Sequence, residues 1–170
     1  MKIDQKGDAG WIYRLTLENL SPADVPAMGD HLKRLCEFDR YSRFFSAMSD
    51  YGIDRYIAGF DWTRMVASGL YRDDTLIGIA ELGWASTMDS ANDASPYAAE
   101  MAVTVDADYR HRGIAAWLVK AVAIQGQRAG IRRMDASWIG GNDSIAKIMR
   151  QYDAQIWLNA AHWHGTASLV

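Results

Sequence analysis

Residues 100–119 constrain this chain more than any other stretch of its sequence. An apolar segment ends at Val105, a basic turn follows, and the turn closes at Gly113. Apolar residues then recur at helical spacing, namely Ile114, Trp117, Leu118, Ala121 and Val122. This order predicts a strand, a tight turn and a helix whose N-terminus can bind an anion, with Arg110 and Arg112 adding positive charge.

The composition is that of an ordinary globular protein, with 49% hydrophobic and 23% charged residues. A length of 170 residues predicts a single domain over residues 1–170. The formal net charge of -3 gives no electrostatic reason to expect nucleic acid as a partner. No apolar run approaches the roughly 20 residues that span a bilayer, and residues 1–8 lack the apolar core of a signal peptide. We therefore expect a cytoplasmic protein with no membrane partner, which also suits its lone Cys36.

The rest of the sequence alternates between strand-like and helix-like patterns. Strand patterns cover residues 11–17, 63–71, 75–85, 97–105, 131–139, 156–158 and 164–169. Helical patterns begin at Ser21-Pro22, cover residues 43–60, and follow Gly113 and Asn142. The short polar link at residues 72–74 predicts a hairpin, and residues 86–96 predict a long loop. The sum is an α+β fold.

Several motifs within this order resemble the GNAT superfamily of N-acetyltransferases. Arg110-His111-Arg112-Gly113-Ile114-Ala115 matches the family's phosphate-binding pattern Arg/Gln-x-x-Gly-x-Gly/Ala, between a strand and a helix as its mechanism requires. Three segments are similar to bacterial GNAT protein-lysine acetyltransferases: Arg43-Phe44-Phe45, Ile53-Asp54-Arg55-Tyr56 and Ala99-Glu100-Met101-Ala102-Val103. The resemblance covers about residues 11–157. It implies a single-domain GNAT fold with a mixed, mainly antiparallel sheet of about seven strands, splayed at residues 97–105 and flanked by about four helices.

The resemblance also implies a binding site for acetyl-CoA. The pyrophosphate would accept hydrogen bonds from backbone amides, with the arginine side chains assisting. These amides belong to Arg110, His111, Arg112, Gly113, Ile114, Ala115 and Ala116. A Cβ at Gly113 would stand between amide and phosphate. The pantetheine arm would pair with the main chain of Val103, Thr104 and Val105, and Asn142 is where the family often places an Asn that contacts the cofactor. The alternative is an ordinary strand-to-helix turn with solvated arginines.

Glu100 is the one acid within the apolar strand, where an ionised carboxylate needs a partner or a function. The resemblance implies a general base whose pKa is raised by burial; the alternative is an exposed Glu paired with an Arg. The amide of Val103 would stabilise the oxyanion. The family often places a proton-donating Tyr seven residues after Asn142, but Met149 occupies that position. Tyr152 is the remaining candidate for the proton donor, or else a core residue.

These inferences predict an enzyme, an acyl-CoA-dependent N-acyltransferase. An amine made nucleophilic by Glu100 would attack the thioester directly in a ternary complex. Residues 37–60 and 86–96 would select the acceptor, a protein lysine or a small-molecule amine. The candidate lining residues are Arg43, Phe44, Phe45 and Trp84. The alternative is a non-catalytic acyl-CoA-binding sensor or interaction module. No metal site is expected, because His162 and His164 lack a completing Cys or acid. The sequence leaves open whether the chain forms a homodimer.

Overall fold

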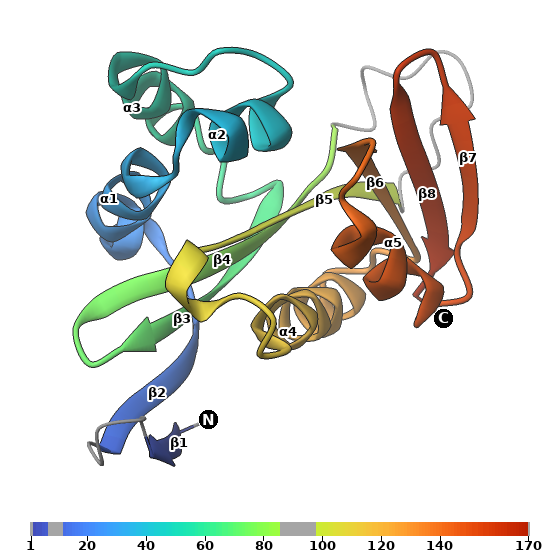
Figure 1. The fold of residues 1–170 in the computed structure, drawn as a ribbon. Helices are drawn as coiled ribbons and strands as arrows, with labels where there is room; N and C mark the ends of the chain where they lie inside the picture. Colours follow the sequence, from blue (N-terminus) through green and yellow to red (C-terminus); the bar gives the residue numbers. More distant parts are fainter. Residues whose placement is uncertain (1, 7–11, 86–97, 170) are drawn as a thin grey trace.

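The computed structural model describes residues 2–6, 12–85 and 98–169. Among these residues, eight strands form one sheet in the order β1-β2-β3-β4-β5-β6-β8-β7 (Figure 1). The strands are β1 (Lys2–Lys6), β2 (Ile12–Asn19), β3 (Met65–Arg72), β4 (Thr75–Gly83), β5 (Ala98–Val105), β6 (Arg133–Ile139), β7 (Gln155–Asn159) and β8 (His162–Ser168). The α-helices are α1 (Val25–Arg34), α2 (Glu37–Phe44), α3 (Asp50–Ala58), α4 (Ile114–Arg128) and α5 (Asp143–Arg150). The predicted α+β class is confirmed.

Helices cover both faces of this sheet. Figure 1 shows α1, α2 and α3 on one face and α4 and α5 on the other. On the first face, Met28 and Leu32 of α1 and Ile53 of α3 have no exposed surface and pack with Ile79 of β4. On the second face, α4 buries a stripe at helical spacing: Ile114, Leu118, Val119 and Val122. Because full burial of each such side chain contributes about 1.5–3 kcal/mol, the sheet is held firmly from both sides.

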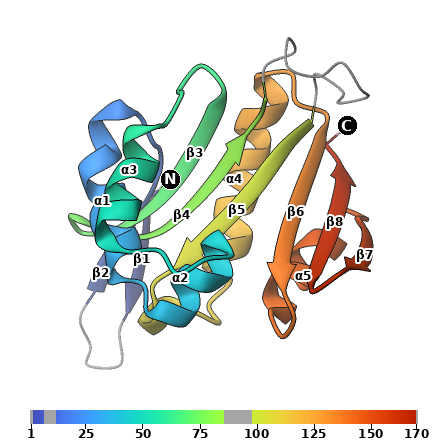
Figure 2. The same cartoon turned by 90° about the horizontal axis from the view of Figure 1, so that it is seen from above.

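The sheet splays in its middle, between β5 and β6. These two parallel strands pair only over Ala98–Glu100 and Arg133–Asp135. Beyond Glu100, β5 stays paired with β4 as far as Val105, but it has left β6. Figure 2 shows the two strands diverging from their paired ends. The splay predicted for this strand is therefore present, and it leaves one edge of β5 available to a ligand.

The helical region before the hairpin differs from its prediction. A single helix over residues 43–60 was expected, whereas α2 ends at Phe44 and α3 begins at Asp50. Phe45 takes a left-handed conformation (φ 53°), which an α-helix cannot continue. Ser49 then caps α3, its side chain accepting a hydrogen bond from the Gly52 amide. The apolar stripe behind the prediction, Ile53, Tyr56, Ile57 and Phe60, begins only in α3 and carried no information on residues 45–49.

Other predicted boundaries hold to within a few residues. The sheet contains one strand more than the expected seven, because β1 was not predicted. Gly126 lies inside α4. A side chain there would collide with Leu82 of β4, so this glycine lets helix and sheet approach closely. The loop predicted at residues 86–96 lies outside the described residues.

Candidate active site

A cavity of about 1020 Å³ opens where β5 and β6 separate. One wall is β5 from Glu100 to Val105, and the opposite wall is β6 from Ala136 to Ile139. The turn before α4 and the first residues of α4 and α5 also line it, as do α2 and parts of β4. Its volume is at the upper end of small-molecule sites, so it has room for an elongated ligand.

The basic turn lies on this cavity. His111 and Gly113 have positive φ angles of 60° and 79°, so the chain reverses tightly before α4 begins. Gly113 is the N-cap of α4 and makes no side-chain cap. The first amides of the helix, from Ile114 to Ala116, have no intrahelical acceptor. A Cβ at Gly113 would meet none of the described atoms, so the approach to these amides is open. The turn presents hydrogen-bond donors to the cavity, as an anion site requires.

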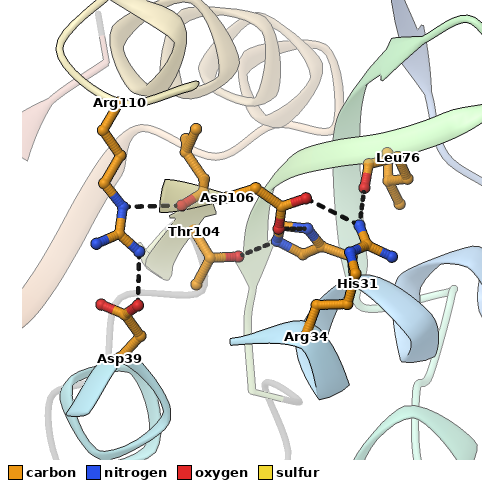
Figure 3. A network of polar contacts seen from close by, with 8 residues as sticks. His31, Arg34, Asp39, Leu76, Thr104, Asp106 and Arg110 are labelled. Atoms are coloured by element: carbon orange, nitrogen blue, oxygen red, sulfur yellow. Dashed lines mark hydrogen bonds and ion pairs between the residues drawn. The ribbon is translucent and has the colours of Figure 1, made fainter. Parts of the chain in front are cut away.

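The side chains of Arg110 and Arg112 were expected to assist in binding the phosphates, but both donate hydrogen bonds within the protein. Arg110 donates hydrogen bonds to the Val105 carbonyl at 3.0 Å and to Asp39 of α2 at 2.7 Å (Figure 3). Burial alone would raise the pKa of Asp39, but the hydrogen bonds from Arg110 and Cys36 hold it below its usual value. The Arg112 side chain donates to the Asp108 carbonyl and is not among the described residues that line the cavity. Arg110 therefore lines the cavity while it is paired with Asp39, and the backbone amides at the start of α4 are the donors of the turn that have no intrahelical acceptor.

The start of α5 contributes polar groups on the opposite side. Asn142 is the N-cap residue of α5, and its side chain makes no capping hydrogen bond. It lines the cavity together with Ser144 and Lys147. Sequence reasoning selected Asn142 but missed Lys147, which lies on the exposed side of α5. In the sequence, Lys147 could have been found only from its position five residues after Asn142, in the helix that Asn142 begins. Its ammonium adds a positive charge to this side of the cavity.

Glu100 lies at the point where the cavity begins. It is the last residue of β5 that pairs with β6, opposite Asp135, and it lines the cavity. Its side chain is exposed, so the expectation of a buried carboxylate is wrong. The apolar run in the sequence suggested burial on both faces, whereas from this residue onward β5 borders an open cavity. A base role for Glu100 would therefore depend on its position and not on burial.

The buried acid of the cavity is Glu81, on the neighbouring strand β4. It is 6% exposed, and its Oε2 accepts hydrogen bonds from Arg43 and Tyr56, both at 2.6 Å. Burial, together with the charge of Glu81, raises the pKa of Tyr56 well above its usual value, so the phenol remains a donor. Sequence reasoning missed Glu81, although it is the one acid in the apolar run 76–82 and carried the same signal as Glu100.

Comparison with known proteins agrees with this geometry. Residues 31–147, more than half of the chain, match the acetyltransferase (GNAT) family. The chain belongs to the GNAT family. No curated protein matches it in sequence. The resemblance inferred from the turn motif and from the order of elements is thereby confirmed.

Solved GNAT structures share the fold. The GNAT domain of PAT from S. lividans has a TM-score of 0.74 at 17% identity, over 98% of this chain and 96% of that one. The putative acetyltransferase yncA from Salmonella typhimurium, solved with its cofactor acetyl-CoA, has a TM-score of 0.71 at 13% identity, over 92% and 94%. A cAMP-binding acyltransferase from Mycobacterium smegmatis has a TM-score of 0.62 at 20% identity, and this chain spans 48% of its length. The predicted GNAT fold is confirmed.

The tyrosine that often serves as proton donor in GNAT enzymes is replaced by Met149, seven residues after Asn142. Met149 has no exposed surface, and its side chain lies against Gly165 of β8. Tyr152 follows the end of α5, packs against the α4-side core and is not among the described cavity-lining residues. Burial raises the pKa of its phenol. Its position therefore favours the core interpretation over proton donation.

Aromatic residues form the wall on the α2 side. Phe44 and Phe45 line the cavity, as do Arg43 and Trp84, so the structure brings all four predicted lining residues together. The Phe44 ring meets Tyr56 edge to face, with ring centroids 5.1 Å apart. Residues 86–96, the other segment expected to select the acceptor, lie outside the described residues.

Two kinds of feature are absent from residues 2–6, 12–85 and 98–169. No helix in these ranges is long and apolar enough to cross a membrane. No group of three or more His, Cys, Asp or Glu side chains there has the spacing of a metal site.

Proposed function

We propose that this GNAT protein is an N-acyltransferase that transfers an acyl group from its CoA thioester to a primary amine. Acetyl-CoA is the proposed donor. One observation carries the proposal: the cavity has a helix N-terminus on its wall and a carboxylate where the strands begin to separate. Acyl-CoA is an elongated molecule with phosphates at one end and a thioester at the other. The two ends of the cavity correspond to these two ends, and family membership supports acyl transfer.

The phosphates would bind at the turn and the pantetheine arm along β5. The free amides of residues 114–116 are suited to the pyrophosphate, because they combine N–H donors with the positive end of the α4 dipole. Lys147 and Asn142 lie on the same cavity and can add polar contacts. Beyond Glu100, β5 has no strand partner on the side of β6, so the main chain at Val103 and Val105 can pair with the pantetheine amides.

The chemistry would be a direct attack in a ternary complex. Glu100 takes a proton from the ammonium of the acceptor, directly or through a water molecule. The amine nitrogen attacks the thioester carbonyl, and the oxyanion accepts a hydrogen bond from the Val103 amide. The C–S bond then breaks, giving the amide product and CoA.

A protein lysine is the first acceptor to test. The aromatic wall of Phe44, Phe45 and Trp84 is suited to the methylene stem of a lysine, which packs on apolar surface while its ammonium stays solvated. A small-molecule amine is the other acceptor class. The cytoplasmic location, the single domain and the homodimer considered from the sequence stay predictions.

Replacing the proposed base tests the mechanism. Glu100→Gln keeps the size and polarity of the side chain but cannot accept the ammonium proton, so we expect turnover to fall by about 100-fold or more. Turnover is measured as free CoA released from acetyl-CoA with a panel of amines and lysine peptides. The matched control is Glu18→Gln, an exposed strand glutamate that does not line the cavity, which should leave the rate unchanged.

Other outcomes would select a different function. Unchanged turnover in Glu100→Gln would remove Glu100 as the base. Binding of acetyl-CoA without turnover on any acceptor would favour the non-catalytic acyl-CoA-binding module.

Tyr152 gives a second test of the assignments. Because this residue does not line the cavity, we expect Tyr152→Phe to release CoA at the wild-type rate. Its thermal stability should change little, since only the hydroxyl is removed. A specific loss of turnover at unchanged stability would restore Tyr152 as the proton donor.

A further inference from the structure

The strand β7 forms one edge of the sheet. It pairs with β8 on one side, and within the described residues no strand lies on its other side (Figure 2). Alternate residues of β7 therefore point their backbone N–H and C=O groups away from the sheet, where another strand can pair with them. An edge of this kind is a surface for association unless the chain protects it.

β7 lacks two of the devices that protect edge strands, a charged residue and a proline. Its sequence is Gln-Ile-Trp-Leu-Asn. Trp157 and Leu158 are 47% and 55% exposed, and they lie on opposite faces because side chains alternate along a strand. The strand at the other edge, β1, has the sequence Lys-Ile-Asp-Gln-Lys, with a charge at three of its five positions. Of the two edges, β7 is the one whose sequence suits pairing with another strand.

The ends of β7 limit how a second strand can pair with it. Asp153 and Ala160 both have a left-handed backbone, with φ angles of 53°. The extended backbone of β7 therefore lies between these two residues, and a partner strand can pair over its five residues and not beyond them. The centre of such a pairing is Trp157.

An antiparallel copy of β7 fits this edge. With a two-fold axis at the centre of the strand, Trp157 lies opposite its own copy. Ile156 then lies opposite Leu158, and Gln155 lies opposite Asn159. Apolar residues meet apolar ones, polar residues meet polar ones, and no like charges come together. The same operation on β1 would set its central aspartate opposite itself and each lysine opposite the other lysine.

The central side chain of this edge is held in place by its neighbours. The Trp157 ring stacks on His164 of β8, with ring centroids 5.8 Å apart and planes inclined by 22°. His164 Nδ1 is in turn 3.0 Å from the Ser137 hydroxyl of β6. Because these contacts restrain Trp157 before a partner arrives, its burial in an interface costs less conformational entropy.

We propose that β7 is the interface of a homodimer, in which the β7 strands of two copies pair antiparallel and join the two sheets into one. The two-fold axis at Trp157 makes the contact isologous, so assembly closes at two copies. An extended acceptor peptide is the competing occupant, since a peptide can also add a strand to a sheet edge. β7 has no carboxylate that would attract a lysine-containing segment, whereas it is complementary to itself.

Sedimentation velocity over a range of micromolar concentrations tests the interface. We expect the wild type to dimerise and Trp157→Lys to weaken the association by about 100-fold or more, because the introduced ammonium meets its own copy across the axis. Ile124→Lys is the matched control, since Ile124 is 40% exposed on α4, away from β7, and the variant should dimerise normally. Circular dichroism checks that both variants are folded. The measurement needs neither CoA nor an acceptor, so it is independent of the proposed function.

Three results would overturn the inference: a wild type that stays monomeric at the highest concentration, a dimer that persists in Trp157→Lys, or dissociation in both variants. If the wild type is monomeric and Trp157→Lys raises the KM for lysine peptides, the edge belongs to the acceptor instead.

Disulfide trapping tests the register while keeping Trp157. In a Cys36→Ser background, which removes the chain's one cysteine, Gln155→Cys protein is mixed with Asn159→Cys protein and treated with a mild oxidant. Residues directly opposite each other are about 4.5–5.5 Å apart between Cα atoms, within the range of a disulfide, so the mixture should give cross-linked dimers. Either variant alone should not, because its two cysteines are four residues, about 13 Å, apart along the strands. Equal cross-linking in the mixture and in the separate variants would contradict the register.

Discussion

Gly113→Glu is expected to abolish CoA binding, with a loss of affinity greater than about 100-fold. The substitution places a carboxylate at the N-cap of α4, where the amides of residues 114–116 point into the cavity. A negative side chain there occupies the anion site and repels the phosphates. The measurement is calorimetric titration of the protein with CoA.

Gly130→Glu provides the matched control. Gly130 also has a positive φ, 89° against 79° for Gly113, and a Cβ at either glycine meets none of the described atoms. Both variants therefore carry the same added charge and similar backbone strain of about 1–3 kcal/mol. Gly130 follows the far end of α4 and does not line the cavity, so its variant should bind CoA normally. Wild-type affinity in Gly113→Glu would refute the assignment of the turn.

Arg43→Met is expected to cause the largest loss of stability, about 3–5 kcal/mol in the free energy of unfolding. The side chains of Arg43 and Glu81 are only 13% and 8% exposed, and their atoms approach to 2.6 Å. Removing the guanidinium leaves the carboxylate buried, and among the described residues Tyr56 is then its one side-chain hydrogen-bond donor. Denaturant unfolding monitored by circular dichroism measures the change.

An exposed ion pair gives the comparison. Arg64 and Asp61 are 3.4 Å apart, with side chains 48% and 50% exposed, so Arg64→Met should cost less than about 1 kcal/mol. Combining Arg43→Met with Glu81→Leu should recover much of the loss, because the unpaired charge is then removed. Equal losses in the Arg43 and Arg64 variants would show that Glu81 reaches solvent when its partner is absent.

Much of the fold follows from local patterns in the sequence. Gly113 between a strand and an amphipathic helix predicts the turn, and the structure places it on the cavity. The hairpin at residues 72–74 and the final strands are predicted because alternation and turn residues act over short distances. The break between α2 and α3 was missed, since Phe45 carries no glycine or proline signal for its left-handed conformation.

The roles of the acids could not be read in the same way. Glu81 and Glu100 each stand alone in an apolar strand, yet one is 6% exposed and ion-paired while the other is exposed. The difference arises because Arg43 of α2 comes to lie over β4, whereas β6 departs from β5 just after Glu100. Neither the packing of Arg43 over β4 nor the departure of β6 from β5 can be predicted from the residues next to Glu81 or Glu100 in the sequence.

The sequence by itself determined the turn at Gly113 and the strand–helix order, because short-range periodicity and backbone conformation encode them. It also determined the family, through the resemblance of its motifs to those of GNAT proteins. Only the tertiary structure decided which side chains face the cavity. His31 and Thr104 are separated by 73 residues and meet only when α1 packs on the sheet. Long-range contacts of this kind depend on packing over the whole chain.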